Sequence, residues 1–149
     1  MTIMEQTGVI NFFSEDITWT LRNKRLIRTW LSRLFFKEGQ QVGEVNYIFC
    51  SDRYLFDLNV KYLEHHTLTD TITFTYSTGN EPITGDVFIS YERVKENAQK
   101  MKVKFSDEVL RLIAHGALHL CGYNDKLPEE KRVMTNKEDF YLLQYSKLG

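Results

Sequence analysis

Apolar and polar positions along the chain follow two different periods, and each period predicts one kind of element. Short apolar or alternating runs predict strands over residues 9–13, 44–50, 71–76 and 85–90. The stretch 77–82 between the last two strands is polar and contains glycine and proline, which are typical of turns. We therefore expect residues 71–90 to form an antiparallel hairpin.

A 3.6-residue period predicts five helices. The clearest spans residues 20–37, because five apolar residues recur at the spacing of one buried helix face: Ile27, Trp30, Leu31, Leu34 and Phe35. Gly39 ends this helix. Further patterns predict helices after Ser51-Asp52, which can cap a helix start, then over 91–101, from Ser106 onward, and over about 129–145.

Two of the shorter patterns also predict which side of the helix is apolar. The helix after Ser51-Asp52 is indicated by Leu55, Leu58, Asn59 and Tyr62, and the last helix by Val133, Phe140, Leu142 and Leu143. Strands and helices do not alternate regularly, which favours an α+β fold over a doubly wound sheet. We expect a single domain over residues 1–149, with a mixed sheet of about four strands packed by about five helices.

Composition narrows the function classes. The 149 residues include 19 Lys+Arg and 20 Asp+Glu, so the net charge is −1 and a strongly basic RNA coat is excluded. Apolar runs are only a few residues long, and the first residues do not resemble an export signal, so we expect a cytoplasmic protein without a membrane span. In that compartment Cys50 and Cys121 are expected to be reduced thiols.

Basic residues are nevertheless concentrated in one helix. Six lie between positions 22 and 37 without an acid among them: Arg22, Lys24, Arg25, Arg28, Arg33 and Lys37. Such a run is often only a solvated helix face, but its local positive charge is also suited to a phosphate backbone. Both interpretations stay open from the sequence.

One segment, residues 115–125, contains chemistry that folding alone does not require. His115 and His119 are four residues apart, so a helix presents both imidazoles on one face, where they can bind one metal ion. Gly122 allows the helix to end in a left-handed turn, after which Asp125 can supply a third ligand. The alternative is that the histidines only cap or pack, but three ligands with an open position would form a catalytic site.

The same spacing occurs in zinc proteases with the pattern His-Glu-x-x-His-x-x-Gly-x-x-His. In those enzymes the glutamate after the first histidine is the general base, and this chain has Gly116 there. The substitution argues against peptide hydrolysis by that mechanism.

The segment His115-Gly-x-Leu-His-Leu-x-Gly-Tyr resembles the metal motif of the YbeY family of rRNA maturation factors. Two other segments resemble the family, and they follow one another along the chain as they do in the family. The first contains Leu58-Asn59, Tyr62 and Thr69-Asp70-Thr71-Ile72-Thr73-Phe74, and the second is Gly85-Asp86-Val87-Phe88-Ile89-Ser90. The resemblance covers roughly residues 45–145. It implies a metal-dependent endoribonuclease that cleaves single-stranded RNA in small-subunit rRNA 3′ maturation, with one zinc ion per chain and the ribosome as partner, and with neither DNA nor a membrane.

Two positions depart from the family pattern. Asp125 stands where the family usually has a third histidine, and Leu63 stands where it usually has an arginine. A carboxylate still ligates zinc but weakens its Lewis acidity, and two histidines with one carboxylate also suit other divalent transition metals. Leucine cannot hold a phosphate, so another cation must replace the arginine or activity is reduced.

We expect His115, His119 and Asp125 to act in catalysis through the metal, and Arg22, Arg25, Arg28, His65 and His66 to be candidates for substrate binding. Exposed loop histidines are the plainer interpretation of His65 and His66. Asp70, Cys121 and Tyr123 are expected to be structural. Two other functions stay open: a ribosome-associated metal-binding factor that cuts nothing, and a metallohydrolase of peptides or small molecules.

Overall fold

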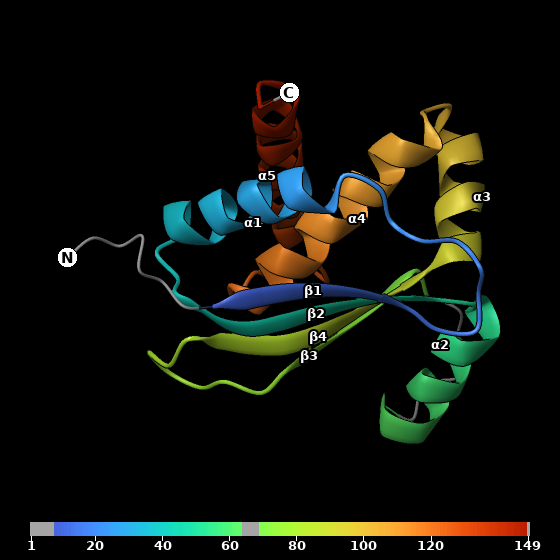
Figure 1. The fold of residues 1–149 in the computed structure, drawn as a ribbon, viewed down its shortest axis with the longest axis horizontal. Coiled ribbons are helices and arrows are strands. Elements are labelled where there is room, and N and C mark those ends of the chain that lie inside the picture. The colour runs from blue at the N-terminus through green and yellow to red at the C-terminus, as the bar shows by residue number, and fades with distance from the viewer. Residues whose placement is uncertain (1–7, 64–68, 149) are drawn as a thin grey trace.

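The centre of the fold is a four-stranded mixed sheet. The computed structural model describes residues 8–63 and 69–148. Its strands are β1 (Val9–Ser14), β2 (Val42–Cys50), β3 (Thr71–Thr75) and β4 (Ile83–Ser90), in the order β1-β2-β4-β3 (Figure 1). The first three strands of that order are parallel, and β3 pairs antiparallel with β4 as predicted. The predicted α+β class and mixed sheet are confirmed.

Helices pack on both faces of this sheet, most of them on one face. They are α1 (Lys24–Lys37), α2 (Asp52–Leu58), α3 (Tyr91–Met101), α4 (Phe105–Leu120) and α5 (Pro128–Ser146), with a π-helix, η2 (Asn59–Leu63), continuing α2. Figure 1 shows α1, α4 and α5 on one side of the sheet and α2 on the other, near one end. Within the described residues, no helix is both long enough and apolar enough to cross a bilayer.

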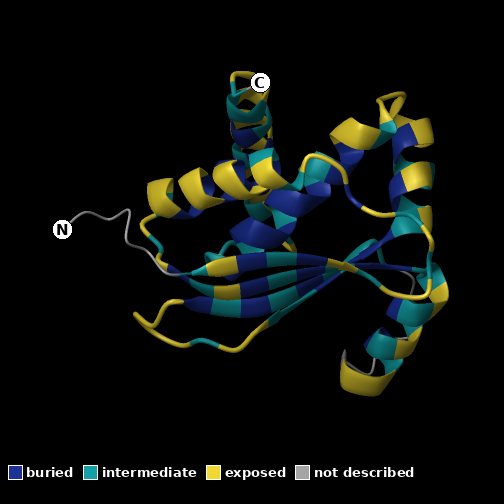
Figure 2. Ribbon diagram, in the orientation of Figure 1, coloured by how far each residue is buried: buried dark blue, intermediate teal, exposed yellow. Residues whose placement is uncertain are grey.

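The main core lies between the sheet and the helices α1, α4 and α5 (Figure 2). The five residues predicted to form the buried face of α1 are all buried. A smaller core under α2, around Cys50, Leu55 and Ile72, closes the other side of the sheet. The two cores hold the sheet between the helices on its two faces, and α4 is the central helix of the larger group.

Three helix starts test the expected caps. Ser51 caps α2, because its hydroxyl accepts a hydrogen bond from the amide of Tyr54 at 3.0 Å. The first helix was expected from residue 20 but begins at Lys24, since Asn23 has a left-handed φ of 60° that cannot continue a helix. The expectation that Ser106 opens α4 is wrong, because the extended cap residue is Lys104.

The predicted inner face of α5 is wrong at three of its four residues. The buried residues are Met134, Glu138 and Tyr141, whereas Val133, Phe140 and Leu143 are exposed, and Leu142 alone of the predicted set packs against the main core. Position 138 carries an acid, so a search for apolar periodicity passes over the true inner stripe. The acid is tolerated there because it has an arginine and a histidine as partners, described below.

Glycines bring α4 close to the sheet. A Cβ on Gly116 would lie 2.5 Å from a methyl carbon of Val87, and a Cβ on Gly85 would lie 2.6 Å from both a Leu120 methyl and the Phe74 carbonyl oxygen. On the next flank of α4, the Tyr47 hydroxyl of β2 donates to the Ile113 carbonyl at 2.8 Å. These contacts fix both the height and the rotation of α4 above the sheet.

Candidate metal centre

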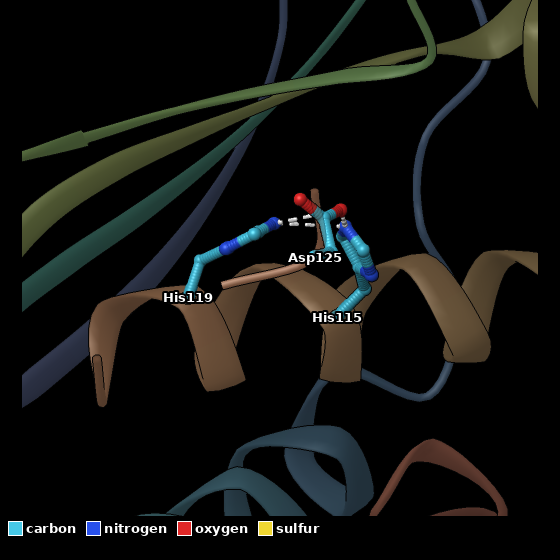
Figure 3. A group of neighbouring side chains, drawn as sticks. All are labelled: His115, His119 and Asp125. Carbon is cyan, nitrogen blue, oxygen red and sulfur yellow. Dashed lines mark hydrogen bonds and ion pairs between the residues drawn. The ribbon is translucent and has the colours of Figure 1, made fainter. Parts of the chain in front are cut away.

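The rotation of α4 decides where its two histidines lie. Gly116 rests on β4, and Ile113 is tied to β2. His115 and His119 are one residue before Gly116 and Leu120, so they lie about 100° around the helix from the β4 contact. This is the flank away from Ile113 and towards β3, the edge strand beyond β4. Figure 3 shows both rings on the side of α4 that faces the strands. Their side chains are 13% and 22% exposed, so a ligand can reach them.

The chain reverses after α4 and brings Asp125 back to the histidines. Gly122 has a φ of 104°, the left-handed conformation expected for it. Asp125 Oδ2 then lies 3.2 Å from His115 Nε2 and 3.3 Å from His119 Nε2, and the two Nε2 atoms are 3.0 Å apart (Figure 3). The three predicted ligands therefore meet at one point.

Hydrogen bonds at the other ring nitrogens fix which atoms face this point. His119 Nδ1 lies 2.8 Å from the carbonyl oxygen of Tyr123, which can only accept, so Nδ1 carries the proton. His115 Nδ1 lies 2.6 Å from Glu138 Oε2 and donates to that carboxylate. In the neutral rings both Nε2 atoms are then lone-pair donors aimed at the same point as a carboxylate oxygen.

This arrangement fits a tetrahedral metal ion. Ligand atoms at ~2.0–2.1 Å from zinc are separated by about 3.3 Å at tetrahedral angles, close to the three separations observed here. Three electron-rich atoms at such distances repel one another unless a cation or a proton lies between them. Among the described residues, this is the one group of histidine, cysteine and acidic side chains whose donor atoms converge in this way.

A buried ion network supports His115 from behind. Glu138 is 3% exposed and also accepts from Arg111 Nη1 at 3.2 Å. Arg111 makes two further hydrogen bonds, at 2.5 and 2.8 Å, to Glu108, which is 1% exposed. The two carboxylates hold the pKa of Arg111 above its ordinary value against the opposing effect of burial. A permanently charged guanidinium thus holds Glu138 against the histidine.

Sequence reasoning missed Glu138 and Arg111. The signal available was an acid in the middle of a buried stripe, three residues before Tyr141 and four after Met134. A carboxylate in such a position needs a cation or a strong donor. Its partners come from another helix, so periodicity within α5 could not identify them.

A second cluster anchors the loop that carries Asp125. The carboxylate of Glu38, at the end of α1, accepts hydrogen bonds from Tyr123 at 2.7 Å, Lys137 at 3.1 Å and Tyr141. Burial by itself would raise the pKa of Glu38, but these donated bonds and the charge of Lys137 hold it below its ordinary value. Tyr123 is a packed aromatic residue as expected, and its backbone carbonyl also orients His119.

Both cysteines are free thiols in the structure. Burial raises the pKa of Cys50 and of Cys121 to about 12, and nearby acids add to the effect. Cys121 packs against the main core, as predicted for a structural residue. Its sulfur is not among the converging donor atoms.

The other predicted site residues lie away from this centre or outside the described residues. Arg22 lies just before α1 and near the first turns of α4. The guanidinium of Arg28 already makes one hydrogen bond within the protein, because its Nε donates to the Ile10 carbonyl at 2.8 Å. The carboxylate of Asp70 accepts a hydrogen bond from Asn97 at 3.2 Å, and Asn97 also donates to Glu108 at 3.3 Å. His65 and His66 fall outside the described residues.

Comparison with known proteins agrees with this geometry. The family model described as endoribonuclease YbeY matches residues 9–146. The chain belongs to the endoribonuclease YbeY family. An endoribonuclease YbeY of Cytophaga hutchinsonii is 49% identical over 130 residues, covering 87% of this chain and 91% of the relative. That of Flavobacterium johnsoniae is 47% identical over 127 residues, covering 85% and 91%.

A solved structure also matches. The solution structure of TM1509 from Thermotoga maritima has a TM-score of 0.63 and 25% sequence identity, and the match covers 92% of this chain and 89% of that one. The YbeY resemblance inferred from the motif is therefore confirmed, and it extends beyond the expected residues 45–145 to include β1 and α1.

Proposed function

We propose that this protein is a metal-dependent endoribonuclease that cleaves single-stranded RNA during maturation of small-subunit rRNA. One observation carries the proposal: two imidazole Nε2 atoms and a carboxylate oxygen converge on one point, while hydrogen bonds at the Nδ1 atoms orient both rings towards it. The names of the relatives support the reaction type. We propose zinc, one ion per chain, because neutral imidazole and carboxylate are suited to it.

The residues around the metal centre have separate roles. His115, His119 and Asp125 would hold the ion, Glu138 and the Tyr123 carbonyl keep both rings oriented, and the Glu38 cluster fixes the loop. A bound zinc ion would polarise the scissile phosphodiester and lower the pKa of a water molecule. Position 116 cannot supply a general base, because it faces Val87 in the sheet rather than the metal site.

The basic strip on α1 is the surface that we propose for the RNA backbone. Three arginines of this strip are exposed: Arg22 just before α1, and Arg25 and Arg33 within it. Glu38, which caps the end of α1, accepts a hydrogen bond from Tyr123 in the loop of the metal centre. RNA along α1 would therefore lead towards the ligands. We also propose that the protein works in the cytoplasm in contact with the ribosome, where such a substrate is found.

Cleavage assays separate this function from its alternatives. Zinc-loaded protein is incubated with single-stranded rRNA fragments and, separately, with casein, beside a His119→Ala variant. We expect RNA cleavage by the wild type, a loss of at least about 100-fold in the variant, and intact casein. Cleavage of casein alone would support the peptidase alternative, metal binding without any cleavage would support the ribosome-associated factor, and equal RNA cleavage by both proteins would overturn the proposal.

A further inference from the structure

A cavity of about 450 Å³ lies at the end of α4 opposite to the metal ligands. Its lining comes from the linker between β1 and α1, the first turns of α1 and α4, and one residue near the end of α5. The volume falls in the range of sites that bind small organic molecules. Val109 in its wall and His119 in the metal centre are ten residues apart, about 15 Å along the helix axis.

The cavity has aromatic walls that are already fixed by packing. The ring of Trp19 lies 5.5 Å from that of Phe105, which also lines the cavity, and 5.1 Å from that of Phe49 in the core. Tyr145 is held by Trp30, with ring centroids 5.2 Å apart. Rings that do not have to be ordered on binding can stack on a planar ligand at little entropic cost.

The rim of the cavity is positively charged. Arg22 lines it, and Lys24 and Arg25 follow in the first turn of α1, which contains no acid. Arg22 is exposed and makes no ion pair or hydrogen bond with any residue in the described part of the chain. Aromatic walls beside such cations are suited to a planar ring that is joined to an anionic group such as a phosphate.

We propose that this cavity binds one nucleotide of single-stranded RNA, with the base against Trp19 and Phe105 and the phosphate at Arg22. The inference rests on the endoribonuclease function proposed above and adds a binding site remote from the cut. It is continuous with the basic strip, because α1 extends for about 21 Å from this rim to Glu38 beside the metal loop. A nucleotide held here would strengthen RNA binding without touching the reacting phosphate.

Nucleotide binding can be measured without the reaction. Adenosine 5′-monophosphate is titrated into metal-free protein in EDTA while tryptophan fluorescence is recorded. We expect quenching of Trp19, since Trp30 is only 1% exposed, and loss of the quenching in Trp19→Phe. Arg22→Glu should weaken binding about tenfold, whereas Arg53→Glu, an equal charge reversal on α2, should not. The absence of quenching, or an equal effect of both reversals, would overturn the inference.

RNA length provides the second test. We compare RNAs of about 4 and about 16 nucleotides, which bracket the site sizes of single-strand-binding domains. Arg22→Glu should raise KM for the longer RNA about tenfold at unchanged kcat and raise KM for the shorter RNA by a clearly smaller factor. Equal changes for both lengths would contradict a remote site. If the wild type cuts neither RNA, the proposed function fails, while the fluorescence titration still decides the cavity.

Discussion

His119 illustrates how a single hydrogen bond determines what a side chain can do. Because its Nδ1 faces a backbone carbonyl, its Nε2 has a lone pair free for a metal. His115 reaches the same state through Glu138, which is itself held by Arg111. At this scale, the ligands are predictable from spacing, whereas the residues that fix their orientation are not.

The residue scale leads to a prediction for Glu138. Glu138→Gln removes the charge that orients and polarises His115, so we expect zinc affinity to fall by about 10–100-fold. Competition with a chromophoric chelator measures the affinity directly. The exposed neighbour Asp139→Asn is the matched control and should bind zinc like the wild type. Equal affinities of the wild type and Glu138→Gln would show that the carboxylate does not support the metal site.

At the scale of elements, the important fact is how α4 sits on the sheet. The helix approaches β4 closely because Gly116 has no side chain, and this contact turns the histidines towards the β3 edge. It also explains why the glutamate of the zinc-protease pattern is absent. A side chain at position 116 would collide with Val87 in the core and could not reach a metal on the neighbouring flank.

Packing at this contact can be tested with Gly116→Ala. The new methyl would lie 2.5 Å from a Val87 methyl carbon, so we expect a loss of about 1–3 kcal/mol in the free energy of unfolding. Urea unfolding measures the loss. In the double variant with Val87→Ala, the cost should be smaller than the sum of the two single costs. Strict additivity would mean that the two residues do not compete for the same space.

The Glu38 cluster between α1, α5 and the metal loop predicts a dependence of stability on pH. Its carboxyl has a lowered pKa in the folded state, so its contribution is complete above the unfolded value near 4.5 and is lost as pH falls through the lower folded value. The free-energy difference between wild type and Glu38→Gln should therefore be largest at neutral pH and shrink below about pH 4.5. Urea unfolding at several pH values measures it, with Asp139→Asn as the control. A difference that grows on acidification would refute the assignment.

At the scale of the whole molecule, charge is segregated. The net charge is only −1, yet α1 carries five basic residues without an acid, and Arg22 lies just before it. The metal centre and the aromatic cavity lie at opposite ends of α4, and α1 connects the two regions along the surface. With the RNA-binding surface proposed above, a nearly neutral protein would bind RNA through one strip.

This segregation predicts moderate and salt-dependent RNA binding. With three to six phosphates neutralised along α1, the logarithm of the association constant should fall with the logarithm of salt concentration at a slope between about −2 and −4. Fluorescence anisotropy with single-stranded RNA measures the slope. Arg33→Glu should make it shallower, whereas Arg53→Glu on α2 should leave it unchanged. A slope near zero would exclude the strip as the RNA-binding surface.

The sequence by itself determined most of the elements and the three candidate ligands, because both depend on local spacing. Periodicity predicts the buried face of α1, and the interval from His115 to Asp125 predicts the three ligands. The tertiary structure decided what depends on contacts between distant segments: the inner face of α5, the hydrogen bond from His115 to Glu138 and the cavity at Trp19. A buried acid resembles a surface residue in the sequence until the fold supplies the cation that stabilises it.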